Sequence, residues 1–115
     1  MKTSNLTVRG YSVLVSEKST WFILEVCLDG AVGLGDATVS GSDAELVGLI
    51  GNLCHWVEAR TTTTLSNLTE YVLQSDATLA RRSLASAIEQ AWFSALAARA
   101  KVPIAAVLGG SVRTK

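Results

Sequence analysis

The sequence predicts an α+β fold, in which a three-stranded antiparallel meander is followed by three to four helices packed on one face. Three observations lead to this class. Three runs rich in β-forming residues precede any helical pattern. A two-residue turn signal, Asp29-Gly30, separates the second run from the third. From Ser42 onward, apolar residues recur at helical spacing.

The three β-rich runs predict strands at Leu6 to Val15, Trp21 to Leu28 and Ala31 to Val39. The second run is the strongest, because it combines aromatic and β-branched residues without a glycine. A type I′ turn requires positive φ at both central positions, and Asp and Gly tolerate that conformation. Asp29-Gly30 therefore predicts that the second and third strands are antiparallel neighbours.

The first helix is expected to begin after Ser42. Ser42-Asp43-Ala44-Glu45 matches a capping box, in which the serine hydroxyl and the glutamate carboxylate each accept a backbone N–H. An apolar face follows at positions i, i+3, i+4, i+7 and i+11, which predicts the side that packs on the sheet. Its residues are Leu46, Leu49, Ile50, Leu53 and Val57.

The rest of the chain predicts two further helices and a short last one. Thr61 to Thr64 is a run of β-branched residues and is interpreted as a connection. Asn67 is expected to cap a short helix, and Asp76 a long helix with a broad apolar face. Pro103 at a first helical position, with Gly109-Gly110 beyond the end, predicts the last helix.

The composition limits the chain to one domain and suggests that one face of this domain normally meets another surface. The 115 residues are 49% hydrophobic and 17% charged, with a mean hydropathy of +0.34, which is apolar for so small a domain. Ten basic and ten acidic residues cancel and are scattered, which argues against nucleic acid as a partner. No run approaches the roughly 20 apolar residues of a membrane span, and no secretion signal is evident. We expect no membrane partner and a cytoplasmic location.

The titratable residues predict neither a metal site nor a catalytic group. Cys27 and Cys54 lack partners at metal-ligand spacing and are interpreted as buried small hydrophobes. His55, the only histidine, belongs to no metal-binding motif. Asp36 has no second acid or histidine to pair with, so we expect it to bond neighbouring backbone. Gly33-Leu34-Gly35 fits a strand better than a phosphate loop, since no helix begins there.

Two stretches resemble a known family. Asp29 to Thr38 is similar to a strand-turn-strand motif, D-G-x-V-G-W-G-E-A. Ala87 to Gly110 is similar to A-I-x-x-A-L-W-D-x-x-x-x-x-x-G-V-P-x-x-x-L-L-G-G. Both motifs belong to the N-terminal capping domain of the enolase superfamily, in its mandelate racemase and muconate-lactonizing branch. The chain therefore resembles an enolase N-terminal domain.

Four departures from these motifs bear on the resemblance. Leu34 stands for the aromatic residue, Asp36 for the glutamate and Ser94 for the aspartate. Lys101 stands where the family usually has glycine at the end of a helix. A lysine at positive φ costs on the order of 1 kcal/mol, so we expect this turn to be either different or strained.

The resemblance implies a domain that lacks its catalytic partner. Residues 1–110 would be the capping domain, and residues 111–115 the start of a linker to an absent (β/α)8 barrel. In the family, a barrel lysine or histidine abstracts the proton α to a carboxylate, and Mg²⁺ held by three barrel carboxylates stabilises the enolate. The full-length parent would then be a Mg-dependent racemase, cycloisomerase or dehydratase. The 115-residue chain would bind no cofactor, contribute no catalytic residue and be inactive alone.

The resemblance also implies two loops that select a carboxylate substrate. By position, these are the loop after the first strand, with Ser16, Glu17, Lys18, Ser19 and Thr20, and the loop Thr38-Val39-Ser40-Gly41 after the third strand. A solvated hairpin turn explains Glu17-Lys18 equally well.

An apolar docking face is expected at Trp92, Phe93 and Leu108, against the barrel or another copy of the chain. The alternative function, from a different class, is a stand-alone protein-binding or oligomerisation module with the same fold.

Overall fold

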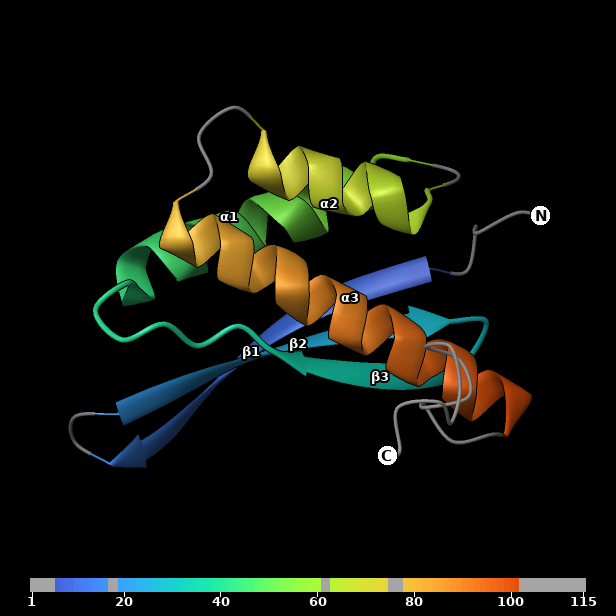
Figure 1. Ribbon diagram of the computed structural model, residues 1–115, viewed down its shortest axis with the longest axis horizontal. Coiled ribbons are helices and arrows are strands. Elements are labelled where there is room, and N and C mark those ends of the chain that lie inside the picture. The colour runs from blue at the N-terminus through green and yellow to red at the C-terminus, as the bar shows by residue number, and fades with distance from the viewer. Residues whose placement is uncertain (1–5, 17–18, 61–62, 75–77, 102–115) are drawn as a thin grey trace, which may run out of the picture.

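The computed structural model describes residues 6–16, 19–60, 63–74 and 78–101 (Figure 1). Three strands precede three helices, which confirms the α+β class. The strands are β1 (Leu6–Ser16), β2 (Ser19–Leu28) and β3 (Ala31–Asp36), and the helices are α1 (Asp43–Glu58), α2 (Leu65–Leu73) and α3 (Leu79–Ala100). The last helix predicted from Pro103 lies outside the described residues.

The strands form the expected antiparallel meander, in the order β1-β2-β3. The register pairs Leu6 with Leu28 across the first interface and Leu28 with Ala31 across the second. Asp29 and Gly30 have φ angles of 51° and 90°, as a two-residue type I′ turn requires. The hairpin predicted from this dipeptide is therefore confirmed.

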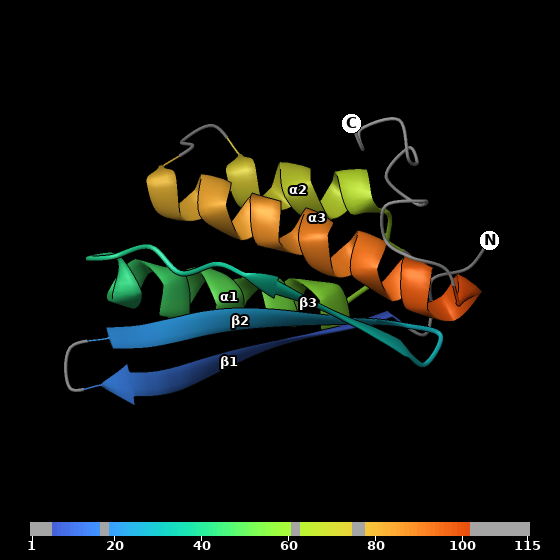
Figure 2. The ribbon, with the colours of Figure 1, turned by 60° about the horizontal axis from the view of Figure 1, so that its bottom comes forward.

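All three helices lie on the same face of the sheet (Figure 2). Alternate residues of the strands point into this layer, because successive side chains of a strand face opposite sides. The large apolar strand residues buried there are Leu6, Val8, Phe22, Leu24, Val26 and Leu28, and Ala37, directly after β3, is buried with them. From α1, the predicted residues Leu46, Ile50, Leu53 and Val57 are buried against them and Leu49 is half-buried. The opposite face of the sheet carries no described element.

Helix α3 rests directly on the backbone of β3, through two glycines. A Cβ added to Gly33 would collide with the carbonyl oxygen of Ala91, and one added to Gly35 with that of Ala87. Small residues on both elements thus allow helix and strand to approach closely. Strand packing, as predicted, accounts for Gly33-Leu34-Gly35.

The helix caps differ from the predictions. Ser42 is the N-cap of α1, but its side chain makes no cap hydrogen bond, because its backbone (φ −119°, ψ 25°) is outside the extended cap geometry. The expected capping box is therefore wrong. The Glu45 carboxylate instead accepts a hydrogen bond from the Thr78 hydroxyl at 2.7 Å, which links α1 to the start of α3.

The two later helices are capped by threonines. Thr64, not Asn67, is the N-cap of α2: its hydroxyl accepts the Asn67 N–H, and the Asn67 side chain accepts the Thr64 N–H. Thr78, not Asp76, is the N-cap of α3, with its hydroxyl accepting the Arg81 N–H. Threonine in the extended conformation provides the same acceptor as the predicted cap residues.

The C-terminal end of α3 is held by two features. Lys101 adopts the left-handed conformation (φ 60°, ψ 41°), so of the two expected possibilities the strained turn is the one observed. Arg99 donates to Asp29 at 2.8 Å and so joins α3 to the β2–β3 turn. Of the described helices, none has the length and apolarity that crossing a membrane would require.

Candidate functional site

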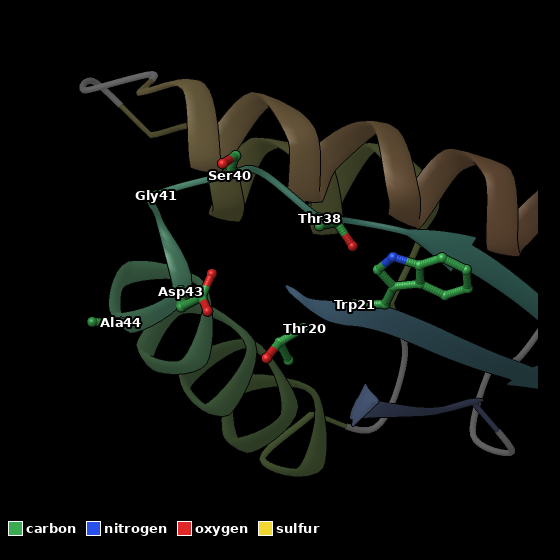
Figure 3. Close-up of a pocket in the computed structure, with 7 residues that line it drawn as sticks. All are labelled: Thr20, Trp21, Thr38, Ser40, Gly41, Asp43 and Ala44. Atoms are coloured by element: carbon green, nitrogen blue, oxygen red, sulfur yellow. The ribbon is translucent and has the colours of Figure 1, made fainter. Parts of the chain in front are cut away.

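Parts of the two predicted substrate-specificity segments meet at one open cavity of about 370 Å³. Thr20 comes from the first segment, and Thr38, Ser40 and Gly41 from the second. Figure 3 shows the side chains of Thr20, Thr38 and Asp43 around this space, with the Trp21 indole at its side. The complete described lining is Thr20, Trp21, Thr38, Ser40, Gly41, Asp43 and Ala44.

The cavity exists because β2 extends beyond the end of β3. The last pair between these strands is Ile23 with Asp36, so Phe22, which pairs with Ser12 of β1, has no partner on β3. Its carbonyl instead accepts the Ala37 N–H at 2.8 Å, and its N–H donates to the Thr38 hydroxyl at 2.9 Å. These bonds tie the segment after β3 to the start of β2 and place Thr38 beside the cavity.

Asp36 supports this turn and has no catalytic geometry. Its Oδ1 accepts the Thr38 N–H at 2.9 Å, which confirms the expectation that it bonds neighbouring backbone. Its own N–H donates to Gln90 Oε1 at 3.2 Å, on α3. The acid therefore shapes the exit of β3 and anchors it to the helix.

The first predicted loop is shorter than expected. Ser16 ends β1, whereas Ser19 and Thr20 belong to β2, because the strands pair almost to the tip of the hairpin. Glu17 and Lys18 lie outside the described residues. Thr20 is half-buried and contributes to the cavity.

In the second segment, neighbouring residues have different roles. Ser40 is exposed and lines the cavity. Val39 is half-buried and packs against the apolar core. The structure therefore brings Ser40, but not the Val39 side chain, to the cavity that Thr20 lines.

Sequence reasoning missed two polar or aromatic residues of the cavity. The sequence pattern identifies Trp21 only as a strand residue, yet its side chain is 51% exposed. Strand alternation carried the signal, since Phe22 faces the core and Trp21 must face away. The sequence pattern identifies Asp43 only as part of a capping motif, although a residue in the first turn of α1 borders the preceding loop.

The predicted docking residues are only partly accessible. Trp92 is half-buried and packs against the core, and Phe93 is also half-buried. Leu108 lies outside the described residues. The large apolar side chains that are most exposed lie elsewhere: Tyr11, Trp21, Val32 and Leu34 on the strands, Val47 on α1 and Leu79 on α3.

The open face of the sheet, which no described helix covers, carries four of these exposed residues: Tyr11, Trp21, Val32 and Leu34. In the register, Leu34 pairs with Glu25 and Val32 with Cys27, and these residues alternate with the buried ones. Tyr11 lies on the same face and donates its hydroxyl to Glu25 at 3.1 Å. This open face is thus largely apolar.

Both cysteines are free, and both are half-buried rather than buried as predicted. Cys54 lies on α1 beside β1. Burial raises the pKa of its thiol, the nearby Glu58 carboxylate raises it further, and a hydrogen bond with the Gly10 backbone opposes the change. The Cys54 thiol is therefore protonated at neutral pH.

The described residues do not provide a binding site for Mg²⁺. Among them, no three His, Cys, Asp or Glu side chains gather closely enough to hold a metal ion. At the cavity, Asp43 is the only carboxylate among the described lining residues. Mg²⁺ favours octahedral oxygen coordination that includes carboxylates, so this arrangement does not fit the ion.

Comparison with known proteins agrees with this fold. The family model for the mandelate racemase / muconate lactonizing enzyme N-terminal domain matches residues 7–109. No curated protein and no solved structure matches the chain. The match includes β1 from its second residue, β2, β3 and all three described helices. The chain therefore belongs to the N-terminal domain family of mandelate racemase and muconate-lactonizing enzymes, within the enolase superfamily.

Proposed function

We propose that this chain is a substrate-specificity lid for a barrel enzyme of the mandelate racemase and muconate-lactonizing type. In that role, the barrel carries the proton abstraction α to a carboxylate and holds Mg²⁺. The observation that carries the proposal is the cavity in which Thr20 of one segment meets Ser40 of the other. Family membership is its second support.

The chain's own contribution is binding and exclusion of water. The hydroxyls of Thr20, Thr38 and Ser40 offer hydrogen-bond donors and acceptors, and Trp21 offers an aromatic surface. The Thr38 hydroxyl already accepts the Phe22 N–H, so its proton remains available for an acceptor on a ligand. Such groups would orient the distal part of a substrate while the lid closes over the barrel.

The proposal is tested by joining the chain to a barrel. The chain is fused through its C-terminus to the catalytic barrel of a mandelate racemase or muconate-lactonizing enzyme from which the native capping domain has been removed. We expect Mg²⁺-dependent isomerase or dehydratase turnover from the fusion, and none from the chain alone. Turnover by the purified 115-residue chain would overturn the assignment.

A pair of variants tests the cavity within that fusion. Trp21→Ala should change the ratio of kcat/KM between two substrates by about tenfold, the size expected for one lost apolar or aromatic contact. Leu79→Ala, which alters an exposed apolar residue that does not line the cavity, should leave that ratio unchanged. Equal effects of both substitutions would argue against a selecting role for the cavity.

The open face of the sheet favours a second candidate, a stand-alone binding module. Tyr11, Val32 and Leu34 expose apolar area there without any described element covering it. A module would bind its partner without a barrel and would fail to restore activity to one. The fusion therefore separates the two functions.

A further inference from the structure

The cavity between the two predicted substrate-specificity segments has one charged side chain in its described lining, that of Asp43. Figure 3 shows the Asp43 carboxylate directed away from α1, toward the space that Thr20 and Thr38 border. Within the described residues, this carboxylate has no hydrogen-bond or ion-pair partner. It is therefore available to pair with a group on a ligand.

The part of the chain that forms the cavity is acidic, although the whole chain is neutral. Every described lining residue comes from residues 19–59, which contain one histidine and no lysine or arginine. Lys18, directly before this stretch, lies outside the described residues. Asp36 is fixed beside the cavity, because its carboxylate accepts the Thr38 N–H at 2.9 Å. The acids of the stretch are Glu25, Asp29, Asp36, Asp43, Glu45 and Glu58.

The N-terminus of α1 also borders the cavity, and helix N-termini attract anions. The helix dipole is equivalent to about half a positive charge at this end. The first turn of α1 already holds two carboxylates, those of Asp43 and Glu45. Their charge exceeds that of the dipole, so this end of the cavity repels an anion instead of attracting one.

The other lining groups suit a cation that carries N–H donors. The hydroxyls of Thr20, Thr38 and Ser40 can each accept a hydrogen bond. The Thr38 hydroxyl keeps a second lone pair after accepting the Phe22 N–H. Trp21 contributes an indole, the aromatic group that attracts cations most strongly. A primary ammonium group has three donors and a positive charge, so it can use the carboxylate and the hydroxyls together.

We propose that the cavity binds a primary ammonium group at the distal end of a carboxylate substrate. This substrate class rests on the proposed lid function, whereas the preference of the cavity for a cation does not. The substrate is bipolar: its carboxylate goes to the barrel and its ammonium group to Asp43. Because the lid repels the anionic end, its charge also sets the direction in which the substrate binds. A substrate with a second carboxylate at its distal end is rejected for the same reason.

NMR titration of the isotope-labelled 115-residue chain tests this preference without a barrel. The probes are n-butylammonium and butyrate, which carry opposite charges on short alkyl chains. We expect n-butylammonium to shift the Trp21 indole N–H and the Ser40 amide, and butyrate to leave both in place. Raising the salt to about 1 M should weaken the binding, because the ion pair is exposed to solvent.

A third probe, butyltrimethylammonium, keeps the positive charge but has no N–H donor. It should bind more weakly than n-butylammonium, because it cannot donate to the carboxylate or the hydroxyls. Equal binding of the two cations would overturn the primary ammonium group as the ligand.

Two variants assign the preference to Asp43. Asp43→Asn removes the charge and should raise the Kd for n-butylammonium about fivefold, the upper value for an exposed ion pair. Glu58→Gln is the matched control: it removes one acid from the other end of α1, away from the lining residues, and should leave this Kd unchanged. Asp43→Glu keeps the charge and should keep the preference. Equal effects of Asp43→Asn and Glu58→Gln, or no shift with n-butylammonium up to about 100 mM, would overturn the proposal.

The barrel fusion separates this inference from the lid function. Its substrates are two carboxylates that differ only in a distal ammonium or hydroxyl group, and Asp43→Asn should lower the ratio of their kcat/KM values about fivefold. An inactive fusion, with selective binding of n-butylammonium by the chain, would refute the lid function and leave the cation preference standing. An active fusion, with n-butylammonium and butyrate binding the chain alike, would refute the cation preference alone.

Discussion

The backbone N–H of Phe22 donates to the hydroxyl of Thr38 at 2.9 Å, which ties the start of β2 to the segment that follows β3. Phe22 itself is buried in the core. The same residue thus anchors the sheet to the helices through its side chain and positions one wall of the cavity through its backbone. Fold and candidate site are joined at this bond.

Removing the Thr38 acceptor should weaken the fold. Thr38→Val keeps the shape but leaves the Phe22 N–H without its partner, so we expect a loss of about 1 kcal/mol in the free energy of unfolding. Urea denaturation followed by circular dichroism measures this loss. Ser40→Ala, on the exposed side of the same segment, is the control and should change stability by under about 0.5 kcal/mol. Equal losses in both variants would show that the bond has no special role.

The contact between β3 and α3 should not tolerate a side chain at Gly35. Gly35→Ala forces a methyl group against the carbonyl of Ala87, which is backbone and cannot turn aside, so we expect destabilisation of about 3 kcal/mol. Gly48→Ala should instead stabilise by about 1 kcal/mol, since its methyl meets nothing within 4 Å and alanine favours the helix. Thermal or urea unfolding of the two variants should therefore shift in opposite directions.

The ion pair between Arg99 and Asp29 should contribute little and depend on salt. Both side chains are partly exposed, which limits the coupling to about 0.2–1 kcal/mol. A double-mutant cycle with Asp29→Asn and Arg99→Gln isolates this coupling, because asparagine also tolerates the positive φ of the turn. The coupling should shrink in about 1 M salt. A value that does not respond to salt would contradict an exposed electrostatic interaction.

Relieving the left-handed residue at the end of α3 should stabilise the chain. Lys101→Gly removes the steric cost of a side chain at φ 60°, and we expect a gain of about 1 kcal/mol. Lys101→Ala keeps a Cβ and should give no comparable gain. Chemical denaturation of the three proteins would measure the difference, and a gain from alanine equal to that from glycine would rule out backbone strain as the cause.

Stability should fall at alkaline pH in a way that depends on Cys54. Burial raises the pKa of its thiol in the fold, so the unfolded chain loses this proton first as the pH rises. The stabilisation is complete below the ordinary thiol pKa and is lost as the pH rises through the raised value. Thermal melts between about pH 7 and 10 should therefore fall less steeply for Cys54→Ala than for the wild type. Parallel curves would contradict the shift.

The sequence by itself determined the order of the elements and the sides that face the core. Asp29-Gly30 required a tight turn because positive φ is a property of those residues, whatever surrounds them. The spacing of Leu46, Ile50 and Leu53 predicted which side of α1 is buried, because helical geometry is regular. These features depend on residues close together in the chain, so local patterns were sufficient.

Only the tertiary structure decided the caps, the cavity and the exposed apolar faces. Glu45 bonds Thr78 instead of closing its own capping box, and Thr38 reaches Phe22 across the end of the sheet. Trp21 becomes part of the cavity because β3 ends two residues before Thr38 while β2 continues. Each of these outcomes depends on which distant segments meet when the helices cover one face of the sheet. A pattern in the sequence does not encode that pairing. A polar side chain such as that of Glu45 can bond a neighbour in the chain or a distant residue, and the distant residue is within reach only after the core has formed.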